Sequence, residues 1–186
     1  MPSYLTIRPI GFIDRGVLDH LAMCIATRCG LPCKVLEGME DPDYAYDEKR
    51  GQYNAKLILK RILQCCSDNA LRVIGITQVD MFVPVLKYVY GLALMEGRCA
   101  VISLHRLRPE FYDQLPDHDL FMGRAEKTAV HEVGHSFGLT HCRDRGCVMY
   151  PSTRIEDTDF KKPEFCLTCI ELFKWNLKIL SPSPNP

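Results

Sequence analysis

The chain has 186 residues, of which 47% are hydrophobic, so it is long enough for one compact domain with a substantial core and short for two. Its 23 basic residues balance its 23 acidic residues, which argues against nucleic acid or an anionic membrane as a partner. No segment has the roughly 18 uncharged apolar residues that a membrane-spanning helix requires, and residues 1–10 lack the features of a signal peptide. We therefore expect a cytoplasmic protein. We also expect a monomer.

The first part of the chain alternates between predicted strands and helices. An alternating apolar run at residues 4–10 indicates a strand, and Asp14 can cap a helix whose apolar side chains recur at helical spacing. Gly30 ends that helix, and residues 33–36 form the next strand. The stretch at 37–53 is rich in charged residues, Gly, Pro and Tyr, so we predict a long surface loop there.

One further helix and three strands are predicted next. The helix spans residues 55–66, and the strongly apolar run at 71–77 has the composition of a central strand covered on both faces. Residues 88–94 and 99–104 form two more strands, joined by a short turn at 96–97. Strands interleaved with helices predict an α/β (α+β) fold with a mixed sheet.

Basic side chains follow the last predicted strand. We interpret His105, Arg106 and Arg108 as part of a solvated face, together with His118 in the acidic loop beyond them. A second interpretation is that one of the two arginines binds the carboxylate at a substrate terminus, because a guanidinium group binds a carboxylate in two places.

The helix predicted at 125–137 carries two histidines four residues apart. His131 and His135 lie on one face of the helix, since four residues make slightly more than one turn. Gly138 lets the backbone leave the helix in a left-handed conformation, which can bring His141 round as a third ligand. The pattern therefore predicts that three imidazoles bind one metal ion.

Three histidines without a fourth protein ligand are typical of a catalytic zinc site, which keeps one position open, rather than of a closed structural site. Glu132 follows His131 directly, so it lies near the metal without binding it and can act as a general base. The motif predicts a zinc hydrolase. The alternative is a catalytically silent, zinc-stabilised module that binds peptides without cutting them.

Four of the ten cysteines form two closely spaced pairs: Cys142, Cys147, Cys166 and Cys169. Such spacings let each pair chelate an ion while the long gap joins two segments, which predicts a second, structural zinc held by four thiolates. Two disulfides or four buried thiols are the alternative, which a cytoplasmic location makes less favourable. Because His141 and Cys142 are adjacent, an extended backbone would direct their side chains to opposite sides, so one dipeptide can serve both ions.

The other six cysteines are scattered: Cys24, Cys29, Cys33, Cys65, Cys66 and Cys99. We expect them to be buried thiols, which behave as small apolar side chains. The first three could in principle hold a metal, and occasional disulfides would be expected if the source were a hyperthermophile.

A methionine follows the histidines at a characteristic distance. Met149 stands eight residues after His141, and the whole arrangement resembles the metzincin metalloproteases, which carry a methionine in a turn beneath the zinc. The combined order of histidines, cysteines and methionine at residues 130–169 is similar to that of the archaemetzincins, one family of that clan. The resemblance implies a zinc-dependent peptidase, with Met149 as an apolar support for the metal ligands.

The resemblance also implies a layout. We expect a single domain at 1–180, with an upper part at 1–138 that ends in the zinc helix and a lower part at 139–180 that contains the methionine turn, the cysteine site and a C-terminal helix at 166–180. The strand at 88–94 would run antiparallel at the edge of a twisted mixed sheet, above the cleft. A polar connection at 152–163 and a flexible Pro and Ser tail at 181–186 complete the chain.

Tyr150 follows Met149 directly. Some metzincins use a tyrosine near this turn to stabilise the transition state, but they have a histidine between the two residues, which this chain lacks. We weigh that role against simple packing. The expected cofactors are two zinc ions, and the expected partner is a peptide or protein substrate whose side-chain preference the sequence does not reveal.

Overall fold

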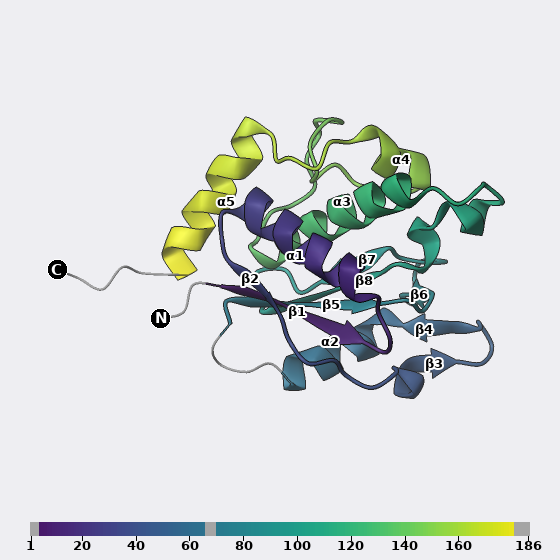
Figure 1. Ribbon diagram of the computed structural model, residues 1–186. Helices are drawn as coiled ribbons and strands as arrows, with labels where there is room; N and C mark the ends of the chain where they lie inside the picture. Colours follow the sequence, from purple (N-terminus) through teal and green to yellow (C-terminus); the bar gives the residue numbers. More distant parts are fainter. Residues whose placement is uncertain (1–3, 66–69, 181–186) are drawn as a thin grey trace.

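Five strands form the central sheet of the molecule (Figure 1). The computed structural model describes residues 4–65 and 70–180. The strand order is β2-β1-β5-β8-β7, with β1 at Leu5–Ile10, β2 at Cys33–Val35, β5 at Arg72–Thr77, β7 at Gly91–Ala93 and β8 at Cys99–Ser103. Every neighbouring pair is parallel except β7 with β8. The predicted mixed sheet with an antiparallel edge strand is confirmed, although that strand is shorter than the predicted 88–94.

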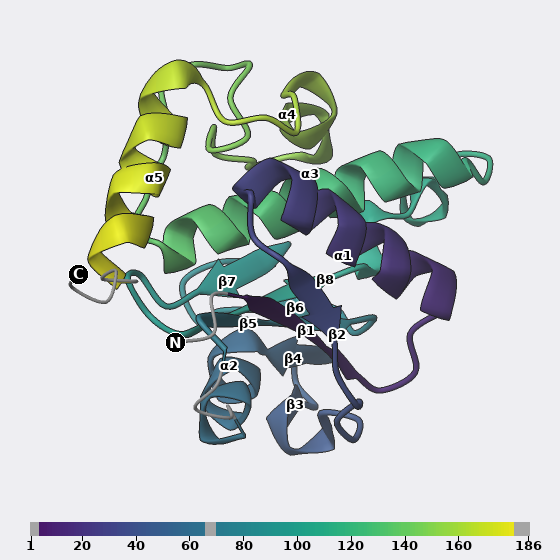
Figure 2. The ribbon, with the colours of Figure 1, turned by 60° about the vertical axis from the view of Figure 1, so that its left-hand side comes forward.

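Helices cover both faces of this sheet (Figure 2). α1 (Arg15–Cys29) and α3 (His118–Ser136) pack together on one face, and α2 (Ala55–Gln64) covers the other. All side chains of β5 and β8 are buried, as expected for parallel strands between two helical layers. The sheet and α1 thus form a rigid support behind α3, the helix that carries the paired histidines.

The ends of α1 follow the sequence. The carboxylate of Asp14 accepts a hydrogen bond of 3.2 Å from the backbone N–H of Val17, which caps the first turn. Gly30 ends the helix with a φ of 66°, a left-handed conformation that glycine adopts without strain. Both predicted helix signals are confirmed.

α5 (Leu167–Leu180) packs beside the C-terminal end of α3. The fully buried ring of Phe173 lies 4.7 Å from that of Phe137, measured between ring centroids. The side-chain amide of Asn176 donates a hydrogen bond of 2.7 Å to the carbonyl oxygen of Phe137. These contacts fix the C-terminal helix, which begins one residue after the predicted start, against the helix of the histidines.

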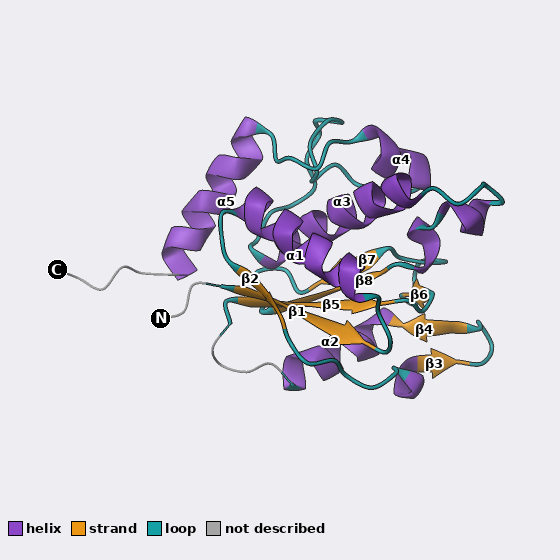
Figure 3. Cartoon of the chain, viewed as in Figure 1, coloured by secondary structure: helices purple, strands orange, loops and turns teal. Residues whose placement is uncertain are grey.

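The predicted loop at 37–53 is wrong in part, because it contains a small second sheet (Figure 3). β3 (Tyr46–Asp47) and β4 (Gln52–Asn54) form a hairpin after a short 3-10 helix at Asp43–Ala45, and β4 pairs with β6 (Met81–Phe82). The rings of Tyr46 and Tyr53 pack across the hairpin, with centroids 5.0 Å apart. Strands of two or three residues are too short for an alternating pattern to reveal them.

Two helical segments also differ from prediction. α3 begins at His118, seven residues before the predicted 125, because the Asp117 carboxylate accepts a hydrogen bond of 2.9 Å from the Leu120 backbone N–H. His118 is therefore a helical residue. The predicted polar connection at 152–163 contains the short helix α4 (Ile155–Phe160), which packs against α3.

Two further 3-10 helices, His105–Leu107 and Pro109–Tyr112, follow β8. Of the chain's predicted features, Cys66 and the tail at 181–186 lie outside the described residues. Across 4–65 and 70–180, no helix combines the length and apolar character needed to cross a bilayer.

Candidate metal centre

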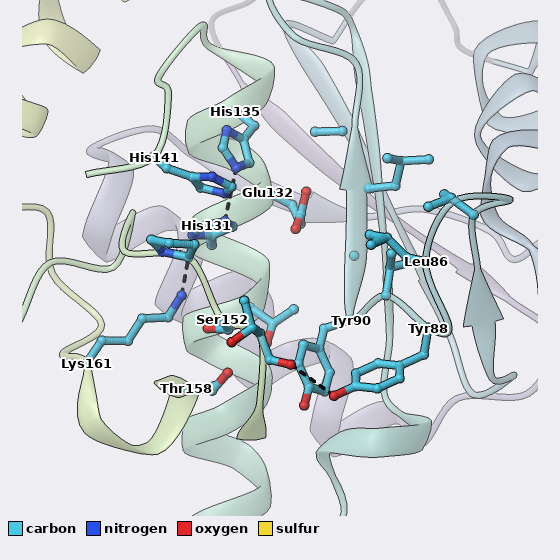
Figure 4. Close-up of a pocket in the computed structure, with 18 of the residues that line it drawn as sticks. Leu86, Tyr88, Tyr90, His131, Glu132, His135, His141, Ser152, Thr158 and Lys161 are labelled. Carbon is cyan, nitrogen blue, oxygen red and sulfur yellow. Dashed lines mark hydrogen bonds between the residues drawn. The ribbon is translucent and has the colours of Figure 1, made fainter. Parts of the chain in front are cut away.

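α3 directs two histidines toward the same side of the helix (Figure 4). The Nε2 atoms of His131 and His135 are 3.0 Å apart. The opposite ring nitrogens are held by backbone carbonyls: Nδ1 of His131 donates to the Val148 oxygen at 2.8 Å, and Nδ1 of His135 donates to the Leu139 oxygen at 2.7 Å. Both rings are thereby fixed with Nε2 facing the site.

A turn at the end of α3 brings in the third histidine. Gly138 adopts a φ of 87°, and Leu139 then returns a hydrogen bond of 3.0 Å to the Gly134 carbonyl. His141 follows, with its ring centroid 4.9 Å from that of His135 and 5.4 Å from that of His131. The ligand atoms of the three histidines lie within 4.8 Å of one another, as the sequence predicted.

This donor set fits a zinc ion. Because both Nδ1 atoms donate to carbonyls, the Nε2 atoms of His131 and His135 carry no proton, and their lone pairs face each other. Two unprotonated nitrogen atoms 3.0 Å apart repel each other unless they share a cation. Burial holds the pKa of His131 well below its usual value and also lowers the pKa of His135 and His141, so the rings are neutral and able to bind metal.

Glu132 lies beside the three histidines, against the edge strand. Its side chain is 7% exposed, and burial raises its pKa to about 8, although the charge of Lys161 opposes this shift. A Cβ atom at Gly91 of β7 would lie 2.5 Å from the Cγ atom of Glu132, so only glycine leaves room for this carboxyl group. A pKa close to neutrality suits proton transfer near neutral pH.

Met149 lies directly beneath the zinc helix. It is fully buried, and a Cβ atom at Gly134 would overlap its sulfur, so the glycine between His131 and His135 lets the methionine approach the helix backbone. Phe165 packs against the same spot. Met149 and Phe165 thus pack closely against the helix backbone between the two histidines.

The four paired cysteines form a second group. The sulfur atoms of Cys142, Cys147, Cys166 and Cys169 lie within 4.8 Å of one another, and all four are free thiols. The Sγ atoms of Cys142 and Cys166 are 3.8 Å apart, well beyond a disulfide bond of about 2.05 Å. Sulfurs bound tetrahedrally at about 2.3 Å from zinc would be about 3.8 Å apart, so this group fits a structural zinc.

The remaining cysteines agree in part with the predicted burial. Cys24, Cys29 and Cys99 are buried, whereas Cys33 and Cys65 are half-buried. Cys24 also lies in a third group of possible ligands, with His20 and Glu126. The Glu126 carboxylate there accepts a hydrogen bond of 2.9 Å from Arg28, whose positive charge disfavours a metal ion.

A cavity of about 560 Å³ opens in front of the three histidines. One wall is the chain at 86–93, including β7, and the other is formed by α3 and the segment that runs from Pro151 to α4 (Figure 4). Glu132 and the histidines face the cavity from α3 and from the turn that follows it. An extended peptide laid along β7 would therefore pass the metal ligands.

Three predicted residues lie elsewhere. Arg106 is not on a solvated face, because its guanidinium binds both carboxylate oxygens of Asp80 at 2.6 and 2.7 Å. Arg108 donates to the side chain of Gln78. Tyr150 is not among the residues that line the cavity; its carbonyl oxygen accepts a hydrogen bond of 2.9 Å from Lys161.

The cavity also contains residues that the sequence did not reveal. Ser152, Thr158 and Lys161 line it from the segment predicted as a polar connection. Thr128 lines it from α3, because it precedes His131 by about one turn and shares its face. The spacing from His131 could have identified Thr128, whereas no local pattern marks the other three.

Known proteins with similar sequences are peptidases. Residues 13–175 match peptidase family M54. An archaemetzincin from Methanocaldococcus jannaschii is 40% identical over 167 residues, which cover 90% of this chain and 90% of that protein. The stretch that matches the family includes the three histidines and the four cysteines of both metal groups.

Solved structures of similar proteins have the same fold. The crystal structure of an archaemetzincin from Methanopyrus kandleri superimposes with a TM-score of 0.81 at 35% identity, covering 94% of this chain and 96% of that one. The archaemetzincin from Archaeoglobus fulgidus, complexed with malonate, gives a TM-score of 0.78 at 29% identity, covering 91% and 99%.

Proposed function

The chain belongs to peptidase family M54, the archaemetzincins, and is therefore a zinc-dependent peptidase; from this premise we propose that Glu132 is the general base of peptide hydrolysis in the cavity. The observation that carries the proposal is the position of this carboxyl group beside three convergent imidazoles, at the back of a cavity open to an extended chain.

The histidines have one task in this mechanism. His131, His135 and His141 would hold the catalytic zinc, and the carbonyls of Val148 and Leu139 keep the first two rings aligned. Zinc in such a site acts as a Lewis acid and makes water an effective nucleophile at neutral pH. The four cysteines would hold the structural zinc that fixes the segment after His141.

Glu132 moves the proton. Its carboxylate takes a proton from the attacking water and then passes it to the departing amine. Packing against Gly91 keeps the group at the edge strand, where a scissile bond paired with β7 would lie. Because β7 is the last strand of the sheet, a peptide can add to it through main-chain hydrogen bonds.

Replacing Glu132 by Gln tests the proposal. The Glu132→Gln variant and the wild type are loaded with zinc, their zinc content is measured, and cleavage of a quenched fluorescent peptide library is followed. We expect the variant to keep two zinc ions per chain while its rate falls by about 10²–10⁴. Glu171→Gln, on the exposed face of α5, should cleave like wild type.

The outcomes separate the proposal from its alternatives. If Glu132→Gln cleaves as fast as wild type, Glu132 is not the base. If the zinc-loaded wild type binds the peptides without cutting any of them, the catalytically silent binding module is the better description.

A further inference from the structure

Three polar side chains cluster at the end of the cavity beyond His131 (Figure 4). Ser152, Thr158 and Lys161 come from the loop before α4, from α4 itself and from the residue after it. Thr158 is 1% exposed and Lys161 is 3% exposed. Their position is unexpected, because burying polar groups costs free energy unless hydrogen bonds replace those lost to water.

The two hydroxyl groups lack such bonds. The Oγ atom of Ser152 and the Oγ1 atom of Thr158 are buried without a hydrogen-bond partner among the described residues. The backbone of Thr158 is satisfied separately, since its carbonyl oxygen accepts a hydrogen bond of 3.1 Å from Lys127. Both hydroxyls therefore have unused hydrogen-bonding capacity, and both residues line the cavity.

The ammonium group of Lys161 also has donors to spare. One of its three N–H groups donates to the Tyr150 carbonyl at 2.9 Å. Nδ1 of His131 is 3.4 Å from the ammonium but directs its own proton to the Val148 carbonyl, so it does not accept from Lys161. Two donors of the ammonium remain for an acceptor in the cavity.

We propose that Ser152, Thr158 and Lys161 form a subsite for a carboxylate group of the peptide substrate. A carboxylate offers two oxygens with about four lone-pair positions and no donor, and its charge matches that of the ammonium. A neutral amide would present its own donors to this cluster. The inference rests on the proposed function, since it takes the cavity to be where a peptide binds.

The carboxylate can come from two places on a peptide. It is the C-terminal carboxylate of a short substrate or the side chain of an Asp or Glu residue. Either group would lie beyond His131, at the end of the cavity where the figure places Thr158 and Tyr90. The subsite would favour peptides that place an acidic side chain or their C-terminal carboxylate in it over neutral peptides of equal length.

Peptide binding tests the subsite without requiring turnover. The zinc-loaded Glu132→Gln protein is titrated with a fluorescein-labelled hexapeptide that has a free C-terminus, the same peptide amidated, and amidated versions with Glu or Gln at each position in turn. We expect one acidic form to bind about tenfold more tightly than its neutral counterpart, as one charge-assisted hydrogen bond predicts. Whether the free C-terminus or a Glu gives the gain identifies the source.

Two substitutions then assign the gain to the cluster. Lys161→Met should abolish the preference for the carboxylate and leave the affinity of neutral peptides nearly unchanged. Thr158→Val, which keeps the shape and the charge, should reduce the preference several-fold and serves if Lys161→Met does not fold. Lys162→Met, a change at the exposed neighbouring residue, is the matched control and should keep the full preference.

Three results would overturn the subsite. The first is equal binding of all acidic and neutral peptides, and the second is a preference that survives in both Lys161→Met and Thr158→Val. The third is that Lys161→Met binds less zinc and loses affinity for every peptide equally. The last result would mean that the only role of Lys161 is electrostatic, toward Glu132 and Cys147. A wild type that shows the preference but cleaves nothing would contradict the proposed function alone.

Discussion

Gly91 on the edge strand lies directly against the side chain of Glu132 on the zinc helix. A Cβ atom at position 91 would lie 2.5 Å from Cγ and 2.7 Å from Cδ and Oε1 of the glutamate. The strand that would hold the substrate and the group that would act as base are thus in contact. Because residue 91 is glycine and has no Cβ atom, the Glu132 carboxylate can occupy this position.

The Gly91→Ala variant should therefore lose activity while keeping its fold and its zinc. The new methyl group pushes the flexible end of Glu132 away from the strand, and a misplacement of about 1 Å can reduce the rate by about 100-fold. Peptide cleavage, zinc content and thermal unfolding are measured together. Gly123 lies on α3, the helix of Glu132, and a Cβ atom there would have no neighbouring atom within 4 Å. Gly123→Ala should therefore behave like wild type. Full activity in Gly91→Ala would show that Glu132 does not act from this position.

The segment at 141–149 connects the two metal groups, which predicts how loss of the structural zinc acts at a distance. The backbone N–H of Cys142 donates to the Met149 carbonyl at 2.9 Å, and Cys142 follows His141 directly. We expect Cys169→Ser to lose one zinc ion per chain and to cleave peptides more slowly. Its midpoint temperature of thermal unfolding should fall by about 10 °C. Metal analysis and thermal unfolding check this.

A cysteine outside the metal groups provides the control for that experiment. Cys65→Ser, at the end of α2, changes a half-buried thiol and should keep both zinc ions. If Cys169→Ser also keeps two zinc ions, the four thiols do not bind metal as a group.

The metal ligands could be predicted because their geometry is local. The spacing of His131 and His135 is set by one helical turn, and Gly138 signals the turn that brings in His141. The cysteine pairs are local in the same sense, since only a few residues separate the members of each pair and the long connection has only to bring the two pairs together. In these cases a few neighbouring residues determine where the side chains point.

The second wall of the cavity could not be predicted because long-range contacts build it. α4 has only six residues, and the short apolar pattern around Ile155 does not distinguish a helix from a loop. Its position depends on Arg124 and Lys127 of α3, more than 30 residues earlier, which bind Asp159 and the carbonyls beside it. Those contacts hold the helix that directly precedes Lys161.

The ion pair of Arg124 with Asp159 should make an asymmetric contribution to stability. Two hydrogen bonds of 2.7 Å join them, and the Arg124 side chain is 2% exposed whereas that of Asp159 is 32% exposed. Asp159→Ala leaves a buried guanidinium without its partner and should cost about 3–5 kcal/mol. Arg124→Met leaves a carboxylate that water can reach and should cost about 1–2 kcal/mol. Urea unfolding measures both, and the reverse order would contradict the argument.

Asp80 gives the last prediction, a stability that depends on pH. Burial alone would raise the pKa of Asp80, but hydrogen bonds from Arg106 and Gln52, and the nearby His105, lower it below the usual value. A carboxyl group whose pKa is lowered by folding stabilises the protein above its unfolded pKa of about 3.9, and that contribution is lost as the pH falls through the folded pKa. Arg106 also stacks on Tyr88 at the cavity wall, 4.2 Å from the ring centroid, so the pair supports the site.

We therefore expect Asp80→Asn to be less stable than wild type by about 1–3 kcal/mol near neutral pH. The difference should shrink as the pH falls below about 4, because wild-type Asp80 then becomes neutral as well. Urea unfolding of both proteins across this range provides the measurement. Acid also releases zinc, but both proteins carry the same metal groups, so this effect cancels in the difference. A gap that stays constant with pH would mean that Asp80 contributes through its shape and not through its charge.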